Sequence, residues 1–394
     1  MATLPLTGLT VVSVEQAVAA PFATRQLADL GARVIKIERP DGGDFARAYD
    51  ATVHGLSSYF VWLNRSKESL TLDVKAPDTR AVVDRLIARA DVFVQNLAPG
   101  AADRMGLSAG ALRARHPRLV VCAITGYGAS GPMAGKKAYD LLVQGETGAI
   151  AATGTTETPS KIGISIADVA AGMYAYSSIL AALLGRTTTG EGASIDVSLF
   201  DALGEWMSAP AYYTRYGGSP PARSGANHAS IAPYGPFRTG DGQTVLLGIQ
   251  TAREWTRFCA GVLEQPALAD DPRFQTNPQR VRHRDALTAE ILAVFARLTA
   301  AAVLDRLDRA GIANARLNDI AAFAAHPQLA ERHRWVAIGS SAGPIEALLP
   351  PAVVEGLDPV MGPIPSLGEH THAILGELGV DAATIAAWKQ KGLI

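Results

Sequence analysis

The sequence predicts an α/β fold built on a parallel sheet, and the alternation of two patterns carries this prediction. Short β-branched runs such as "LTVVSV" (9–14) and "RVIKIE" (33–38) alternate with stretches of helical periodicity such as "PFATRQLADLG" (21–31). The strand pattern returns at "DVFVQN" (91–96) and "RLVVCAITGYG" (118–128). Strands separated by helices of this length form parallel sheets covered on both faces, so we expect a Rossmann-like large domain.

Further helices follow from the same patterns. An amphipathic stretch at 77–90 and "ALRARHP" (111–117) predict helices that flank the 91–96 strand. Residues 169–185 are rich in Ala, Leu and Met and predict a helix buried on nearly every side. This stretch is at the short limit of a membrane span and contains Tyr, Ser and Gly, so we interpret it as a core helix. "GASIDVSLFDALGEWM" (192–207) predicts one more strand and helix.

Two Pro/Gly-rich passages divide the chain. We expect residues 1–206 to form the N-terminal part of the large domain and 207–237 to be an extended linker. Residues 238–338 then form a smaller, mostly helical α+β domain, in which "ALTAEILAVFARL" (286–298) is the clearest amphipathic stretch. A second linker spans 339–366, and the closing helices within 367–394 pack on the large domain.

Composition excludes several classes of partner. A formal charge of −1 and a pI near 6.7 provide no global field for nucleic acid or an anionic membrane. Cys122 and Cys259 form no disulfide framework and no zinc pattern, and the start of the sequence lacks the pattern of an export signal. We therefore expect a cytoplasmic protein without a metal, and without nucleic acid or membrane as partner.

One phosphate-binding motif is present but is in the wrong context. "GYGASG" (126–131) satisfies G-x-G-x-x-G after a strand, yet no apolar helical pattern follows it. The first strand-to-helix turn, where a dinucleotide fingerprint belongs, reads "VEQAVAAP" and contains no glycine. The motif therefore does not indicate a dinucleotide site. No G-x-S-x-G hydrolase motif and no H-E-x-x-H metal motif occurs in the sequence.

Three cations follow the ends of predicted strands. Arg39 comes after 33–38, Arg104 after 91–96 and Lys137 after 118–128. Each of them alone fits a surface ion pair or a turn. Because the carboxyl ends of parallel strands meet at one edge of the sheet, the three together predict a site for a ligand with several phosphates.

A lone carboxylate stands at the start of the apolar stretch. Asp168 is the one acid in "KIGISIADVAAGMYAYSSILAALLGR" (161–186). Aspartate is a preferred N-cap residue, so the pattern fits a structural cap, and it also fits a reactive acid.

Read together, several segments resemble the family III CoA-transferases, the group of formyl-CoA transferase and the carnitine CoA-transferases, which also includes α-methylacyl-CoA racemases. The segments that carry the resemblance are "LADLGARVIKIERPDGGDFAR", "LNRSKESLTLDVK", "ADVFVQNLAPGAADRMGL", "ITGYGASGP", "AYDLLVQGETG" and "ILAALLGRTTTGEGASIDVSLFDA". The resemblance covers nearly the whole chain. It implies a CoA-binding large domain and a homodimer whose two subunits interlock like links of a chain, with the Pro-rich passages as the connectors.

The resemblance also implies roles for residues. Asp168 matches the catalytic aspartate, which attacks an acyl-CoA thioester and passes through mixed anhydrides and an aspartyl-CoA thioester. A helix N-terminus at this point would favour the ionised carboxylate. The positions that match contacts to coenzyme A, bound as the acyl-CoA substrate, are Val18, Ala19, Arg39, Leu72, Lys75, Asn96, Leu97, Ala98, Arg104, Lys137, Tyr139 and Asp140.

Alternatives within the resemblance remain open. A racemase of this family uses a histidine where this chain has Tyr139, and a tyrosine with a pKa near 10 is a poor general base at neutral pH, so transfer is favoured. The glycine run that closes the site of formyl-CoA transferase is missing. Gln16, Asn227 and His228 are candidate contacts to the acceptor acid, and Arg215 and Arg223 suggest a small dicarboxylate. A CoA-binding protein without catalysis is the third reading.

Overall fold

The computed structural model describes residues 3–394, which form two compact units. The first unit contains the chain up to Ala149, Ile162–Ala209 and Ala330–Ile394. The second contains Ile150–Lys161 and Pro210–Leu329. Each unit has its own hydrophobic core, and each is described by itself.

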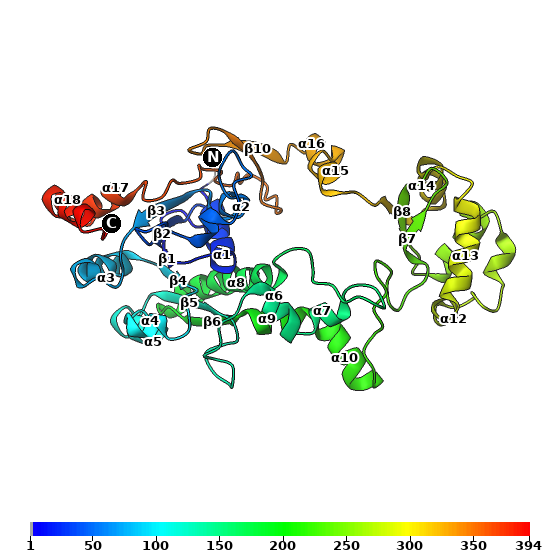
Figure 1. Ribbon diagram of the computed structural model, residues 1–394, viewed down its shortest axis with the longest axis horizontal. Helices are drawn as coiled ribbons and strands as arrows, with labels where there is room; N and C mark the ends of the chain where they lie inside the picture. Colours follow the sequence, from blue (N-terminus) through cyan, green and yellow to red (C-terminus); the bar gives the residue numbers. More distant parts are fainter. Residues whose placement is uncertain (1–2) are drawn as a thin grey trace. The chain divides into compact units, whose positions relative to one another are not determined.

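A six-stranded sheet forms the centre of the first unit (Figure 1), and it is parallel, as the sequence predicts. The strand order is β3-β2-β1-β4-β5-β6, the order of the doubly wound dinucleotide-binding sheet. The register places Val12 of β1 opposite Ile35 on one side and Phe93 on the other. The strands are β1 (Thr10–Val14), β2 (Arg33–Glu38), β3 (Lys67–Thr71), β4 (Val92–Gln95), β5 (Val120–Thr125) and β6 (Ser194–Ser198). Strand β3, with the sequence "KESLT", lacks a β-branched run and was not predicted.

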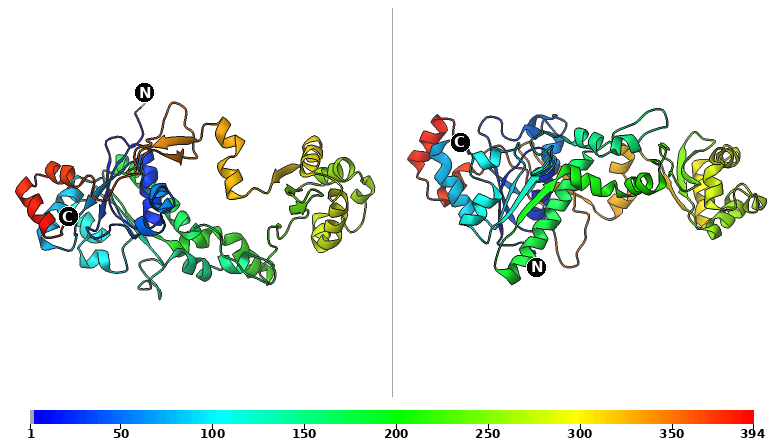
Figure 2. Two further views of the ribbon diagram at one scale, coloured as in Figure 1. Left: turned by 45° about the horizontal axis from the view of Figure 1, so that its top comes forward. Right: turned by 90° about the horizontal axis from the view of Figure 1, so that it is seen from below.

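Helices cover both faces of this sheet (Figure 2). Successive residues of a strand point to opposite faces, so Val11 belongs to one core cluster and Val12 to the other. One face packs on α1 (Ala19–Asp29), α8 (Ile166–Thr189) and α9 (Leu199–Trp206). The other packs on α3 (Arg80–Arg89), α5 (Ala109–Arg115), α17 (Thr371–Glu377) and α18 (Ala382–Gln390). The C-terminal helices therefore belong to the core of the first unit, although they come last in the sequence.

Shorter elements complete the first unit. They are η1 (Phe45–Ala48), α2 (Ser58–Asn64), η2 (Pro77–Thr79), α4 (Ala101–Arg104), α6 (Asp140–Glu146) and the antiparallel pair β10 (Trp335–Ile338) and β11 (Ile345–Leu348); α7 (Ala149–Ala152) begins at its boundary.

The second unit packs helices on a small antiparallel sheet. Its strands β7 (Tyr234–Arg238), β8 (Thr244–Gly248) and β9 (Ala313–Arg316) run in that order. The helices are α11 (Ala252–Arg257), η3 (Phe258–Val262), η4 (Pro266–Ala269), α12 (Asn277–Arg282), α13 (Arg284–Phe295), α14 (Ala300–Ala310) and α15 (Ile320–Ala324); α16 (Pro327–Glu331) ends at the boundary.

The structure differs from the expected linkers and domain limits. Residues 207–237 contain helix α10 (Ser208–Gly217) and the start of β7. A helix can form here despite Pro210, because this proline lies in the first turn of α10, where a missing N–H is tolerated. The 339–366 passage contains β11, and its Ile364 is buried. Residues 150–161 join the second unit and 330–338 join the first, so neither limit of the small domain coincides with the expected one.

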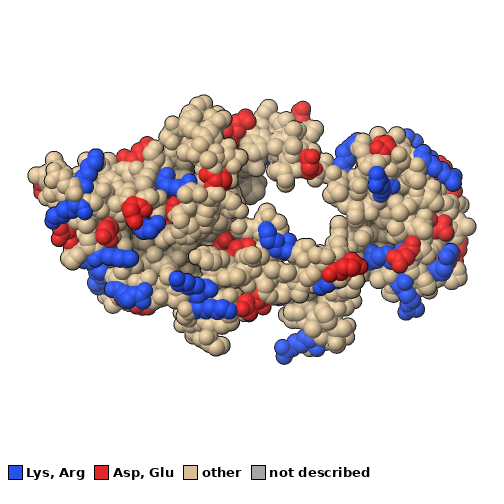
Figure 3. Space-filling view, viewed as in Figure 1, with Lys and Arg blue, Asp and Glu red and all other residues tan. Residues whose placement is uncertain are grey.

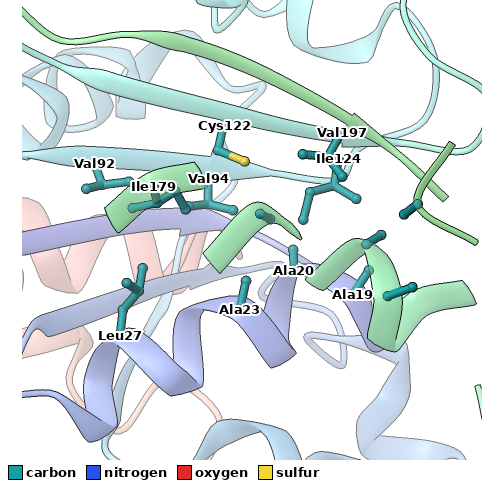
Figure 4. Close-up of a cluster of buried hydrophobic side chains, with 14 of the residues drawn as sticks. Ala19, Ala20, Ala23, Leu27, Val92, Val94, Cys122, Ile124, Ile179 and Val197 are labelled. Carbon is teal, nitrogen blue, oxygen red and sulfur yellow. The ribbon is translucent and has the colours of Figure 1, made fainter. Parts of the chain in front are cut away.

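Helix α8 is the element that brings the candidate nucleophile to the core. Of the described helices it is the one that by itself has the length and hydropathy of a membrane span. Its buried residues are mostly alanines, which pack it on α1 in the core of the first unit, as the sequence predicts. Met173 and Leu184 are exposed, however, so the expectation that the helix is buried on nearly every side is wrong. Figure 4 shows side chains of α1 and α8 gathered beside those of β4, β5 and β6.

The close approach of α8 to α1 depends on Gly172. A Cβ atom at this position would lie 2.7 Å from the Ala19 carbonyl oxygen and 2.9 Å from the Phe22 ring. Any side chain here would push the two helices apart, because the first contact is with backbone.

We expect Gly172→Ala to destabilise the protein by roughly 1–3 kcal/mol in urea unfolding, as overpacked cores do. Gly185→Ala is the matched control, because it lies in the same helix and a Cβ there meets nothing within 4 Å. The control should be neutral or stabilising, since alanine is the better helix former. Equal effects of the two substitutions would contradict this account of the α1–α8 contact.

Candidate active site

The turn after β1 lies at the point where the strand order of the sheet reverses, between β1 and β4. Strands β1 and β4 are neighbours, and the helices that follow them cover opposite faces, which opens a crevice at their carboxyl ends. The Gln16 N–H donates to Asn96 Oδ1 at 2.9 Å, and Asn96 Nδ2 donates to the Gln16 carbonyl at 2.8 Å. Both polar atoms of the Asn96 side chain therefore hold the turn.

A buried ionic network holds the same turn from the other side. Asp44 Oδ1 accepts the Ala17 N–H at 3.0 Å, and Asp44 Oδ2 lies 2.6 Å from Lys36 Nζ. Lys67 Nζ lies 2.7 Å from Glu15 Oε1, and the side chains of all four ionic residues are fully buried. Buried charges persist only when they are paired and hydrogen-bonded, so this network resists rearrangement. It fixes Ala17 in a left-handed conformation, with φ of 61°.

The network was not predicted from the sequence. Lys36 lies between two isoleucines in β2, and Lys67 begins the polar run of β3; both patterns ordinarily indicate a solvated face. Burial lowers the pKa of Lys67 to about 8, although the Glu15 carboxylate opposes this shift.

Asp168 does not cap α8. The helix begins at Ile166, its N-cap residue is Ser165, and Asp168 is the third residue of the first turn. The carboxylate of Asp140, at the start of α6, takes the cap position instead. Its Oδ1 accepts the Ala167 N–H at 2.7 Å and the Asp168 N–H at 3.4 Å. The expectation of an N-cap at Asp168 is wrong because the helix starts earlier and is capped from another element.

The electrostatics of Asp168 also differ from the expectation of a readily ionised acid. The side chain is only partly exposed, and burial followed by the charge of Asp140 raises its pKa from 3.8 to about 7. In the chain that the structure describes, no cation or hydrogen-bond donor offsets this shift. An acid that is half ionised near neutral pH and unpartnered is characteristic of catalytic sites.

Tyr49 lies within electrostatic range of Asp168 and was not predicted from the sequence. Its pKa is raised to about 12 by burial, with Asp44, Asp168 and Tyr139 adding to the shift. Its ring contacts Tyr59, with centroids 5.6 Å apart, and Tyr59 in turn contacts Trp62 at 6.3 Å. Aromatic residues at these spacings resemble ordinary core positions, and only the fold brings them to the site.

The positions implied to contact CoA all lie after carboxyl ends of strands. Arg39, Lys75, Ala98, Arg104, Lys137 and Tyr139 are exposed, Leu97 is half-buried, and Val18, Ala19 and Leu72 are buried. At the three buried positions only the backbone could reach a ligand. The Asp140 carboxylate is half-buried, and both of its oxygens accept hydrogen bonds, the second from Gln144 Nε2 at 2.7 Å.

The "GYGASG" loop has a packing role in this arrangement. A Cβ on Gly126 would lie 2.3 Å from the Cβ of Ala138, so glycine allows the segment that carries Tyr139 and Asp140 to close on the end of β5. This close approach explains the first glycine of the motif without a phosphate.

The remaining candidates belong to the second unit. Arg223 donates to the carbonyls of Ala151, Thr155 and Thr156. The His228 ring stacks on Tyr234 at 5.2 Å. Asn227 and Arg223 line a groove of about 500 Å³ that also includes Arg284. Arg215 lies on the exposed helix α10.

The structure shows no global charge pattern on the face in view, where Lys and Arg are interspersed with Asp and Glu (Figure 3). Within residues 3–394 no group of three or more His, Cys, Asp or Glu could hold a metal ion.

A doubly wound sheet with an unpartnered acid at its crevice defines an α/β enzyme, and comparison with known proteins identifies which family. The profile of CoA-transferase family III matches residues 6–371, and the chain belongs to this family.

Relatives agree with this assignment over nearly the full length. The chain is 33% identical to succinate–glutarate CoA-transferase of Agrobacterium fabrum, covering 95% of this chain and 96% of the relative. It is 36% identical to acetyl-CoA:oxalate CoA-transferase of Acetobacter aceti, with coverages of 85% and 86%. Among solved structures, a CAIB/BAIF family protein from Brucella suis matches with a TM-score of 0.84 and 34% identity, covering 96% of this chain and all of that one. The resemblance inferred from the sequence is thus confirmed, and the protein is a CoA-transferase.

The raised pKa of Asp168 predicts a pH-dependent stability. A carboxyl whose pKa is higher in the folded state binds its proton more tightly there, so folding stability falls as pH rises from about 4 through 7. We expect the thermal midpoint of Asp168→Asn to come close to that of wild type only near pH 4, and to exceed it by a margin that widens up to about pH 7. Differential scanning calorimetry across this range tests the expectation, and a gap that stays constant or narrows with pH would contradict it.

Proposed function

We propose that the protein transfers CoA from an acyl-CoA donor to a carboxylic acid acceptor, with Asp168 as the nucleophile. The observation that carries the proposal is the Asp168 carboxylate, partly exposed beside Tyr49 and without a cation to neutralise it. A structural acid would be paired, whereas a nucleophile must keep an electron pair available.

The proposed reaction has two symmetric halves. An Asp168 oxygen attacks the thioester carbonyl carbon, the C–S bond breaks, and the CoA thiolate leaves a mixed anhydride. The thiolate then attacks the Asp168 carbonyl carbon, releasing the donor acid and leaving an aspartyl-CoA thioester. The acceptor carboxylate attacks the carbonyl carbon of this thioester, the C–S bond breaks, and the CoA thiolate leaves a second mixed anhydride. The thiolate finally attacks the acyl carbon of the acceptor, which yields the new acyl-CoA and frees Asp168.

The proposed substrates are small dicarboxylates and their CoA thioesters. The names of the Agrobacterium and Acetobacter relatives, with succinate, glutarate and oxalate, support this class. Transfer is preferred to racemisation because Tyr139 occupies the position at which the racemases have a histidine. We take succinyl-CoA and glutarate as the first pair to assay.

Exposed cations at the crevice are proposed to bind the phosphates of CoA. Arg39 follows β2, Arg104 ends α4 after β4, and Lys137 lies in the loop after β5. Guanidinium groups suit phosphates because they offer paired donors.

We expect Asp168→Ala to abolish transfer from succinyl-CoA to glutarate, because the covalent step is lost. Wild-type protein incubated with succinyl-CoA alone should carry an acyl or CoA adduct on Asp168, detected by peptide mass spectrometry after hydroxylamine trapping. Arg39→Ala and Arg104→Ala are the matched controls. Both substitutions should raise the KM for succinyl-CoA, roughly tenfold for each 1.4 kcal/mol of binding free energy lost, and both variants should still form the adduct. Transfer by Asp168→Ala, or an adduct on another residue, would refute the assignment.

We also propose that two chains form an interlocked homodimer, as the resemblance implies. Tyr212, Tyr213 and Tyr216 on α10 are 54–79% exposed, and a surface of this kind is typically covered by a partner. Light scattering should give twice the chain mass, and mixed tagged and untagged dimers should exchange very slowly because separation requires opening a unit. A stable folded monomer, or hybrid dimers within minutes, would exclude the interlocked arrangement.

A further inference from the structure

The first turn of α8 receives its cap from a distant acid. The N-cap residue Ser165 makes no side-chain hydrogen bond to the turn, and the N–H groups of Ala167 and Asp168 both donate to Asp140 Oδ1. The second Asp140 oxygen accepts from Gln144 Nε2, and Gln144 Oε1 accepts the Ile162 N–H at 2.8 Å. Asp140 and Gln144 of α6 thus fix the segment that leads into the nucleophile.

This cap competes with Asp168 for the same donors. Acidic residues in the first turn of a helix are ordinarily stabilised by its free N–H groups and its dipole, which lower the pKa of the acid. Here Asp140 takes two of these groups and adds a second negative charge. The raised pKa of Asp168 agrees with this geometry, since burial and Asp140 are its causes.

We propose that Asp140 is a positioning residue for the transfer reaction: it occupies two N–H groups of the first turn of α8 and brings a second negative charge to the helix start, so that the Asp168 carboxylate is left without hydrogen bonds and available for attack on the thioester. The inference rests on the proposed role of Asp168. A carboxylate that gives no electron density to hydrogen-bond donors is the stronger nucleophile, and the bond that it forms to the acyl carbon replaces the C–S bond of the thioester.

Other titratable groups near the start of α8 do not replace Asp140 in this role. Tyr49, from the segment after η1, lies within electrostatic range of Asp168, Asp44 and Tyr139, and its raised pKa keeps it neutral near pH 7. From α1, the first turns of α8 meet the Ala19 carbonyl and the Phe22 ring.

The charged groups of the other packed elements act further along α8 or on the sheet. Arg25 and Asp29 of α1 act on Tyr176, two turns beyond Asp168. Asp196 of β6 acts on Cys122, and Asp201 of α9 accepts from Ser198. Asp140 is therefore the charged group that acts on Asp168 among the described residues.

The test is the pH profile of kcat/KM for succinyl-CoA with glutarate as acceptor. Wild type should lose activity below about pH 7, where Asp168 is protonated. Asp140→Asn keeps an oxygen that can accept the two N–H groups but removes the charge. The acid limb of the profile is the range in which kcat/KM falls as the pH decreases. We expect this limb to move down by about one pH unit or more in Asp140→Asn. Near pH 5.5 the variant should then keep roughly tenfold more of its plateau activity than wild type keeps of its own. The plateau itself should fall.

Two variants serve as controls. Glu146→Gln removes a carboxylate from the same helix, where Glu146 pairs with Lys136 at the surface, and its profile should match wild type. Asp140→Glu keeps the charge, and its acid limb should stay near that of wild type. If Asp140→Asn does not fold, Asp140→Ser is the smaller neutral acceptor and should shift the limb in the same direction.

An acid limb that does not move in the neutral Asp140 variants would overturn the proposal. The adduct experiment separates this failure from failure of the proposed function. If Asp168 carries the adduct and the limb does not move, only the role of Asp140 is wrong. If the adduct lies elsewhere, the nucleophile itself is wrong.

Discussion

The contact between the Asp140 carboxylate and the first turn of α8 is the interaction on which the site depends. Asp140 of α6 accepts a hydrogen bond from the first turn of α8, although α8 begins more than twenty residues later in the chain. The contact places two carboxylates at one helix end, of which one is fully hydrogen-bonded and the other is not. The two aspartates are chemically identical, so their surroundings alone give them different roles, one as a helix cap and the other as the proposed nucleophile.

The surrounding fold supports this arrangement through rigid contacts. Gly172 lets α8 lie directly on the start of α1, so Asp168 is held near the turn that follows β1. That turn is fixed by Asn96 on one side and by the buried Lys36–Asp44 pair on the other. The strand order creates the crevice at the carboxyl ends of β1 and β4, and the buried ion pairs hold the turn after β1 at its edge. The site is therefore built on elements that cannot shift independently.

The sequence predicts much of the fold because most strands and helices carry clear periodicity. It also singles out Asp168, since a lone acid beside an apolar run is conspicuous. It does not predict β3, whose "KESLT" has a charged pattern. It also does not predict the buried network of Lys36 and Lys67, because a lysine in a strand ordinarily lies on a solvated face. The cap by Asp140 and the proximity of Tyr49 depend on contacts between distant segments. No local pattern encodes such contacts, so they emerge only when the fold is known.

The most direct test of the central claim is the pKa of the Asp168 carboxyl itself. Carbon-13 NMR of protein labelled at the aspartate carboxyl carbons, compared with Asp168→Asn, identifies the resonance that belongs to this residue. The account predicts that this resonance titrates near pH 7 in wild type and at a lower pH in Asp140→Asn. A titration near 4 in wild type, the range of an ordinary aspartate, would contradict the account.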